Sequence, residues 1–174
     1  MSEENCTETW TLADGEKLTL HPIAPDDAAR EQAFVRGLST KSSYLRFHGT
    51  IKELSTKDLN KFTHPDSRNT VALIVVHNGK TGEEEIGVAR YVIDLDGTNC
   101  EFAVVVADKW QKRGIGTRLM NALLKHLQLS GVKQISGSVL KSNSTMLKFI
   151  KQLGFVETNI PDDPSTLLVT KYFD

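Results

Sequence analysis

The chain opens with a strand pattern that gives way to helical spacing. Polar and apolar residues alternate over Lys17 to His21, as they do in a half-buried strand. Apolar residues then recur at helical intervals from Ala29 to Leu38, after a Pro25-Asp26-Asp27 segment in which an aspartate can cap the helix. The spacing from Ser55 to Asp58 is that of a capping box and predicts a second short helix.

The segment before the first strand is polar and shows neither the alternation of a strand nor the spacing of a helix. We therefore expect residues 1–16 to form a flexible N-terminal arm, because chain ends are poorly ordered unless something ties them down. Residues 17–174 contain no repeat, low-complexity tract or linker-like stretch. They are predicted to form a single domain.

The middle and end of the chain contain the strongest periodic signals. Residues 70–77, 86–94 and 99–107 read as three strands in meander order, separated by glycine-containing turns. The period then changes to 3.6, and an amphipathic helix over residues 116–130 ends before Gly131. The remaining segments alternate between strand and helix, with strands at 135–140, 155–159 and 166–172 and a helix at 143–153. This order predicts an α/β fold with a parallel strand pair covered by helices.

Composition narrows the classes of partner. The 174 residues include 21 Lys and Arg against 22 Asp and Glu, a formal charge of −1, so no broad basic surface for nucleic acid or anionic membrane is expected. The longest apolar runs fall far short of the roughly 20 residues of a membrane span, and the acidic N-terminus does not resemble a signal peptide. Cys6 and Cys100 form no C-x-x-C pair, and the five histidines show no ligand spacing, so no metal is expected. These features favour a cytoplasmic protein.

A glycine-containing loop between a strand and the amphipathic helix carries the clearest chemical signal. Glycines let the backbone approach a ligand, and the unpaired N–H groups and dipole at a helix N-terminus attract anions. Lys109, Lys112, Arg113 and Arg118 would make the region locally basic. The pattern predicts a polyphosphate ligand held by Gln111, Lys112, Arg113, Gly114, Ile115, Gly116 and Thr117.

Two other phosphate-binding loops fit this segment less well. A nucleotide-triphosphate loop requires Gly-Lys-Ser/Thr, whereas Thr117 follows Gly116 directly. A dinucleotide-binding loop requires a third small residue, and Leu119 stands in its place. Both alternatives are therefore disfavoured.

The segment from Gln111 to Gly116 resembles the Q/R-x-x-G-x-G/A sequence of the GNAT acetyltransferase superfamily, and the order of elements from Lys17 to Tyr172 is similar as well. The resemblance implies a mixed, mostly antiparallel central sheet flanked by helices and splayed between the strands near 101–107 and 134–140. It also implies that acetyl-CoA is the acetyl donor, with its pyrophosphate in the glycine loop. The further donor contacts that it implies are Val104, Val105, Val106, Asn143 and Met146.

Other segments resemble a particular branch of that superfamily, the bacterial protein-lysine acetyltransferases that modify acyl-CoA synthetases. They are Tyr44 to Phe47, Glu53 to Ser55, Glu101 to Val104 and Asn143 to Leu147. The resemblance implies a protein substrate that is acetylated on a lysine, and direct transfer is preferred because Cys100 is disfavoured as a nucleophile. Tyr44, Arg46, Phe47 and His48 are candidate acceptor contacts, although Tyr44 and Phe47 could equally be the buried face of a helix. Many relatives carry a fused regulatory domain, for which we expect no room within 174 residues.

Acetyl transfer to an amine requires a base, and Glu101 is the candidate. A lysine amine with a pKa of about 10.4 is neutral in only about one molecule per few thousand at pH 7, and only the neutral amine attacks a thioester. Glu101 begins an otherwise apolar strand and also resembles the general base of the related enzymes. Cys100 is expected on the opposite strand face and is disfavoured as a nucleophile. Ile150 stands where many relatives have a tyrosine that protonates the leaving thiolate.

Two other functions remain open at this stage. One is acetylation of a small amine, and an acidic pocket beside Glu101 would favour a polycation such as a polyamine. The other is a sensor that binds acyl-CoA without catalysis, with Glu101 turned away from the thioester.

Overall fold

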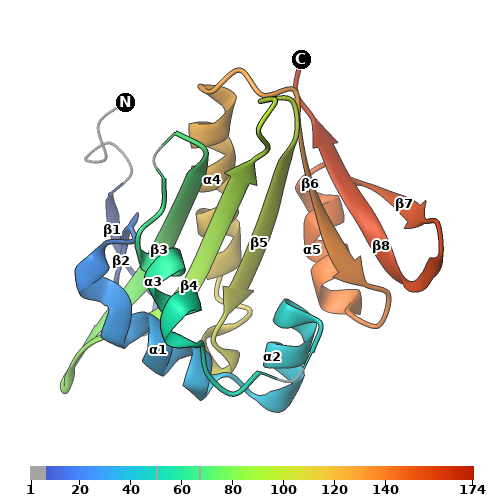
Figure 1. Ribbon diagram of the computed structural model, residues 1–174. Coiled ribbons are helices and arrows are strands. Elements are labelled where there is room, and N and C mark those ends of the chain that lie inside the picture. Colours follow the sequence, from blue (N-terminus) through green and yellow to red (C-terminus); the bar gives the residue numbers. More distant parts are fainter. Residues whose placement is uncertain (1–6, 50, 67) are drawn as a thin grey trace.

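The computed structural model describes residues 7–49, 51–66 and 68–174. In this part of the chain a central sheet carries helices on both faces (Figure 1). The strands are β1 (Glu8–Thr11), β2 (Lys17–Pro22), β3 (Thr70–Gly79), β4 (Gly82–Ile93), β5 (Cys100–Val106), β6 (Gln134–Leu140), β7 (Val156–Ile160) and β8 (Asp163–Tyr172). The helices are α1 (Ala28–Gly37), α2 (Thr40–Phe47), α3 (Thr56–Thr63), α4 (Ile115–Gln128) and α5 (Ser144–Gln152), with 3₁₀ turns η2 (Pro25–Asp27) and η3 (Asp108–Trp110).

The strands lie in the order β1-β2-β3-β4-β5-β6-β8-β7, and every neighbouring pair is antiparallel except β5 with β6. The predicted three-strand meander is confirmed as β3, β4 and β5. Seven residue pairs join β4 to β5, whereas one parallel pair, Glu101 with Ser136, joins β5 to β6. Beyond that pair the two strands diverge (Figure 1), which confirms the splayed, mostly antiparallel α/β sheet.

Part of the predicted N-terminal arm is a strand instead. β1 pairs with β2 from Glu8 opposite Leu20 to Thr11 opposite Lys17, and Trp10 packs against the core. The prediction of an irregular arm was wrong here because four residues are too few for an alternating pattern to stand out. Residues 1–6, with Cys6, lie outside the described part of the chain.

The N-terminal cap of α3 is the one that the sequence predicts, whereas that of α1 is different. Ser55 caps α3 as predicted, since its hydroxyl accepts the N–H of Asp58 at 3.1 Å. Asp27, in contrast, does not cap α1. Its buried carboxylate accepts the N–H of Ala24 at 2.8 Å and binds Arg30 at 2.6 Å, so it holds the 3₁₀ turn that precedes the helix.

The sheet separates two cores. On one face, α4 and α5 pack over the larger core, and the apolar stripe of α4, including Leu119, Met120 and Leu123, is fully buried. On the other face, α1 and α3 cover a smaller core with Phe34 and Ile74. The helix α2 lies below the open end between β5 and β6 (Figure 1). Among the described residues, no helix is both long and apolar enough to cross a membrane.

Candidate functional site

A cavity of about 650 Å³ opens where β5 and β6 diverge. Its walls come from α2, from β5, from the loop that precedes α4, and from the start of α5. The structure thus brings together segments that are up to a hundred residues apart in sequence. Of the residues predicted to contact the donor, those that line the cavity are Val104, Val105, Val106, Gln111, Lys112, Gly114, Ile115, Gly116, Thr117, Asn143 and Met146.

The loop before α4 has the backbone conformation that glycine favours. Gly114 lies in the left-handed region with φ of 81° and directly precedes the first residue of α4. A Cβ at Gly116 would lie 3.6 Å from the ring of Phe149, so a larger side chain there would fill the cavity. The first N–H groups of α4 have no partner within the helix, and the positive end of the helix dipole is at the same place. This arrangement can bind a pyrophosphate.

The edge of β5 supplies a second kind of binding surface. Since β6 pairs with β5 only at Glu101, the backbone from Val104 to Val106 has no neighbouring strand on that side. The side-chain amide of Gln111 donates to the carbonyl of Val106 at 3.0 Å and so ties the loop to the strand end. An extended amide-containing chain can pair with such an edge as an added strand does. The pantetheine arm of acetyl-CoA has this chemistry, so the residues present fit the donor.

The structure corrects the placement of three of the four predicted cations. Arg113 does not line the cavity, and its guanidinium binds Asp14 at 3.0 Å. Arg118 lies 3.5 Å from Glu8, and Lys109 lies 3.7 Å from Glu84. Of the four, only Lys112 lines the cavity.

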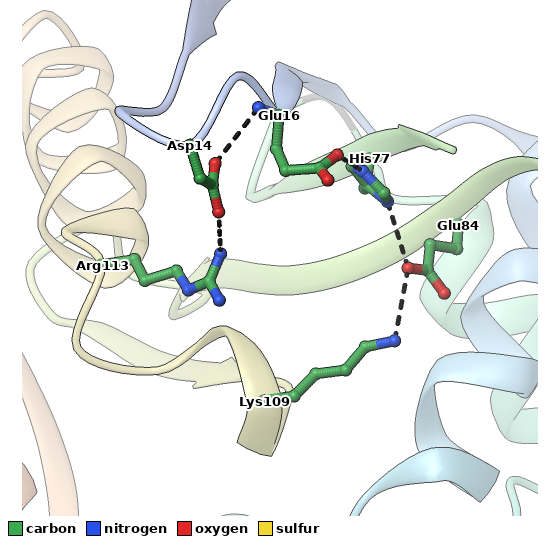
Figure 2. Close-up of polar contacts among 6 residues, drawn as sticks. All are labelled: Asp14, Glu16, His77, Glu84, Lys109 and Arg113. Atoms are coloured by element: carbon green, nitrogen blue, oxygen red, sulfur yellow. Dashed lines mark hydrogen bonds and ion pairs between the residues drawn. The ribbon is translucent and has the colours of Figure 1, made fainter. Parts of the chain in front are cut away.

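The Arg113–Asp14 pair and a chain of contacts from Lys109 join the loop to the turn between β1 and β2, as Figure 2 shows. Glu16 in that turn contacts His77, which reaches Glu84 at 3.2 Å, and Glu84 in turn faces Lys109. The ring of His77 also packs against buried Trp110, with centroids 4.6 Å apart. Arg113 and Lys109, which were predicted to bind the ligand, therefore hold the loop in position.

Two cations that the sequence analysis missed line the cavity instead. Lys41 comes from α2 and Lys148 from α5, so neither is near the glycine loop in sequence. The signal for Lys148 was present, because Thr145, Lys148 and Gln152 recur at helical spacing and all line the cavity. The other lining residues that were missed are Ser42, Leu45, Asp108, Trp110, Ser142, Ser144 and Phe149.

Hydrogen bonds to Asp108 hold α2 beside the loop. The Asp108 carboxylate accepts the backbone N–H and the hydroxyl of Ser39, both at 2.9 Å, and the hydroxyl of Ser42. Although partial burial works against it, these hydrogen bonds lower the pKa of Asp108. The charged carboxylate therefore holds the first turn of α2 at the cavity wall.

Asn143 lies at the start of α5 between two cavities. Its side-chain oxygen accepts the N–H of Met146 at 3.2 Å and caps the helix, which leaves the amide N–H groups to face a ligand. It lines both the large cavity and a smaller adjoining one of about 50 Å³. His48 and Arg46 also line the smaller cavity.

Glu101 is exposed near the start of β5 and does not itself line either cavity. It shares a strand face with Ala103, which lines the smaller cavity. Burial, reinforced by the positive charge of Arg90, lowers the pKa of Arg46 to about 10. The charge of Glu101 opposes this shift, so Glu101 lies within electrostatic reach of Arg46.

The remaining predicted acceptor contacts are placed differently. Phe47 packs against the smaller core, and the guanidinium of Arg46 lies 4.7 Å from its ring centroid. Tyr44 is 49% exposed and, like Phe47 and Glu101, does not line either cavity. His48 ends α2 with φ of 55°. The structure therefore brings Arg46 and His48 to the cavity and makes Phe47 a packing residue.

Two side chains are removed from the chemistry by burial. Cys100 faces the larger core, and desolvation raises the pKa of its thiol to about 12, so it carries no thiolate near neutral pH. Ile150 is 1% exposed in the core, so this position supplies neither an acid nor a contact to the leaving sulfur.

Comparison with known proteins agrees with this geometry. A family model described as "Acetyltransferase (GNAT) family" matches residues 27–155. An acetyltransferase of Pseudomonas aeruginosa is 29% identical over 158 residues, which cover 91% of this chain and 85% of that protein. Acetyltransferase Pat of Mycolicibacterium smegmatis is 32% identical over 143 residues, which cover 82% of this chain but only 42% of that longer protein.

A solved structure shows a similar arrangement. The GNAT domain of PAT from S. lividans superimposes with a TM-score of 0.86 at 26% sequence identity. The match covers 99% of this chain and 100% of that domain. The similarity therefore extends over the whole sheet, including the divergence of β5 and β6.

Proposed function

Since the chain belongs to the GNAT acetyltransferase family, we propose that it transfers the acetyl group of acetyl-CoA to the side-chain amine of a lysine in a protein. Family membership accounts for the donor and for the reaction class. The observation that carries the proposal is the 650 Å³ cavity, which joins the N-terminus of α4 to the unpaired edge of β5, the strand that also carries Glu101.

The donor contacts follow from the two surfaces of the cavity. The N–H groups at the start of α4, with Lys112 and the lysines of α2 and α5, hold the pyrophosphate. The backbone from Val104 to Val106 pairs with the amides of the pantetheine arm. When bound, the donor supplies an activated acetyl thioester at the inner end of the cavity.

The proton transfer is assigned to Glu101. Its carboxylate takes the proton of the lysine ammonium, directly or through one water, so that the nitrogen lone pair becomes available. A C–N bond then forms to the acetyl carbon as the C–S bond breaks, the sulfur leaves with the electron pair, and the new amide nitrogen releases its second proton to the thiolate or to solvent. The departing thiolate is a weak enough base to leave without a dedicated acid, which is consistent with Ile150 in the core.

Two observations support a protein acceptor over a small polycation. Among the described residues that line the two cavities, Asp108 is the only acid, and Ser39 and Ser42 already hydrogen-bond to it. A polyamine would require several acidic contacts near the thioester. The second is that the segments Tyr44 to Phe47 and Glu101 to Val104 resemble those of bacterial protein-lysine acetyltransferases.

The test is a comparison of acceptors under identical conditions. Purified acyl-CoA synthetases and a polyamine are each incubated with the protein and isotope-labelled acetyl-CoA, and initial rates are measured. We expect label on a single synthetase lysine, located by peptide mass spectrometry, and none on the same synthetase with that lysine replaced by arginine. A polyamine with a higher kcat/KM than every protein tested would refute the protein acceptor.

A further inference from the structure

The smaller cavity adjoins the larger one. It occupies about 50 Å³ and shares Leu45, Arg46, Val104, Asn143 and Met146 with the large cavity. Its own walls add residues of β5 and β6 close to Glu101 and Ser136, where the two strands pair. If the donor follows β5 from the glycine loop inward, as the proposed function requires, its acyl group reaches this small space.

The aromatic ring of Phe102 forms part of the wall of this space. The ring of Phe102 on β5 lies against the backbone of Gly137 on β6, so closely that a Cβ at position 137 would be 2.7 Å from a ring carbon. Glycine is therefore the residue that lets the ring occupy this place. Both residues line the smaller cavity.

The ring is held in place from behind. Phe102 is 8% exposed, and its ring packs on that of Phe155 with centroids 5.2 Å apart. The Glu101–Ser136 pair fixes the two strands one residue before Phe102 and Gly137. This part of the wall therefore cannot retreat without disturbing the larger core.

We propose that Phe102, admitted by Gly137, sets the upper limit on the acyl chain that the enzyme transfers. A space of about 50 Å³ suits a group as small as acetyl. In this proposal the Phe102 ring blocks chains of four carbons or more. One methylene group that a pocket cannot accommodate lowers the kcat/KM of the longer substrate by about 10- to 200-fold relative to the shorter one. The substrate class is thus short-chain acyl-CoA, and Phe102 is its specificity-determining residue.

The experiment measures dissociation constants of acetyl-, propionyl-, butyryl- and hexanoyl-CoA for the full chain, each relative to free CoA. In the wild type we expect at least about tenfold weaker binding of butyryl-CoA than of acetyl-CoA. Phe102→Ala should reduce this difference at least tenfold, and Phe102→Leu should reduce it less. The kcat/KM values with a protein acceptor should follow the same order.

Phe34→Ala is the matched control. Phe34 is a similarly buried phenylalanine, 5% exposed, but it lies in the smaller core on the other face of the sheet. It should lower the melting temperature as Phe102→Ala does and leave the acetyl-to-butyryl ratio unchanged. Gly137→Ala should displace the Phe102 ring and so alter the ratio without removing the ring.

The outcomes separate this inference from the proposed function. Equal binding of acetyl- and butyryl-CoA by the wild type, or an unchanged ratio in both Phe102 variants, would overturn the limit on chain length while leaving acetyl transfer intact. If the wild type bound no acyl-CoA at millimolar concentration, the proposed function itself would fail, and the chain-length limit with it.

Discussion

The two faces of the sheet offer different kinds of interaction to the two proposed substrates. On the face covered by α4 and α5, buried side chains are almost all apolar, and the ligand groups are backbone N–H and C=O groups at the loop and the β5 edge. On the face covered by α1 and α3, charged groups are buried, including Glu31, Glu85 and Arg90. The candidate acceptor residues Arg46 and Glu101 belong to this second face. In the proposed reaction, donor binding thus depends on backbone shape, and acceptor chemistry depends on charge.

The buried charges of the second face form one cluster. Arg90 binds Glu31 at 3.1 Å and stacks 4.3 Å from the centroid of the Phe62 ring. Burial, and then the neighbouring Glu31 carboxylate, raise the pKa of Glu85 well above its usual value. Burial lowers the pKa of Arg90. The loss of a single charge is therefore expected to disturb this face more than the apolar face.

Replacing Glu101 should give the largest effect and tests whether the second face performs the chemistry. We expect Glu101→Gln to lower kcat about 10²- to 10⁴-fold, because the glutamine cannot accept the amine proton. The dissociation constant of acetyl-CoA should stay within about twofold, since the donor is held by the other face. Glu157→Gln, an exposed change on β7, is the control. Near-normal turnover of Glu101→Gln at saturating acceptor would move the base to another group such as His48.

Replacing Gly114 tests the backbone site on the first face. In Gly114→Asp a carboxylate would compete with the pyrophosphate for the N–H groups of α4, and we expect no detectable thermal shift with acetyl-CoA. Gly114→Asn is the matched control, because asparagine tolerates the left-handed backbone equally well and adds no charge. The Gly114→Asn protein should bind acetyl-CoA at least about tenfold more tightly than the Gly114→Asp protein. Equal affinities would show that charge at this position does not matter to the ligand.

A smaller effect is expected from the turn that holds the loop. Asp14→Asn removes the ion pair with Arg113 but no group that lines the cavity. Exposed ion pairs contribute at most about 1 kcal/mol, so acetyl-CoA affinity should fall by about two- to fivefold. Glu53→Gln breaks a comparable exposed pair with Arg36, remote from the loop, and should leave the affinity unchanged. Identical affinities in both variants would mean that the turn does not position the loop.

The same contrast explains what the sequence could predict. The donor loop is contiguous, from Gln111 to Thr117, so its glycines and the following helix could be recognised from local patterns alone. The strands β3 to β6 and the helices α4 and α5 have strong periods and were predicted within a few residues. These elements form the first face and most of the cavity.

The rest of the site depends on contacts between distant segments. Lys41 and Lys148 come together only because α2 and α5 both line the cavity at the divergence of β5 and β6. Arg113 was expected at the ligand, but Asp14 of the first hairpin, 99 positions away, binds it. Local patterns cannot show which of several nearby cations has an acidic partner elsewhere in the fold.

The smallest effect on turnover is expected from Glu85, which tests whether the charged cluster affects stability independently of catalysis. The pKa of Glu85 is raised in the folded state, so folding takes up a proton between the ordinary carboxyl pKa and the raised value. The stability that the protonated form contributes is therefore present at low pH and is lost as the pH rises through the folded-state value. Glu85→Gln removes this ionisation but keeps the size and an N–H group that can donate to Glu31.

We therefore expect Glu85→Gln to raise the melting temperature at neutral and higher pH and to flatten its decline from acidic to neutral pH. Turnover should remain unchanged. Glu83→Gln is the control, because Glu83 is an exposed neighbour on the same strand and lies 3.7 Å from Arg30. Thermal unfolding followed by circular dichroism from pH 4.5 to 9 measures the effect. A Glu85→Gln protein whose melting temperature keeps the wild-type pH dependence would mean that Glu85 is ionised in the folded state, with Arg90 balancing both carboxylates.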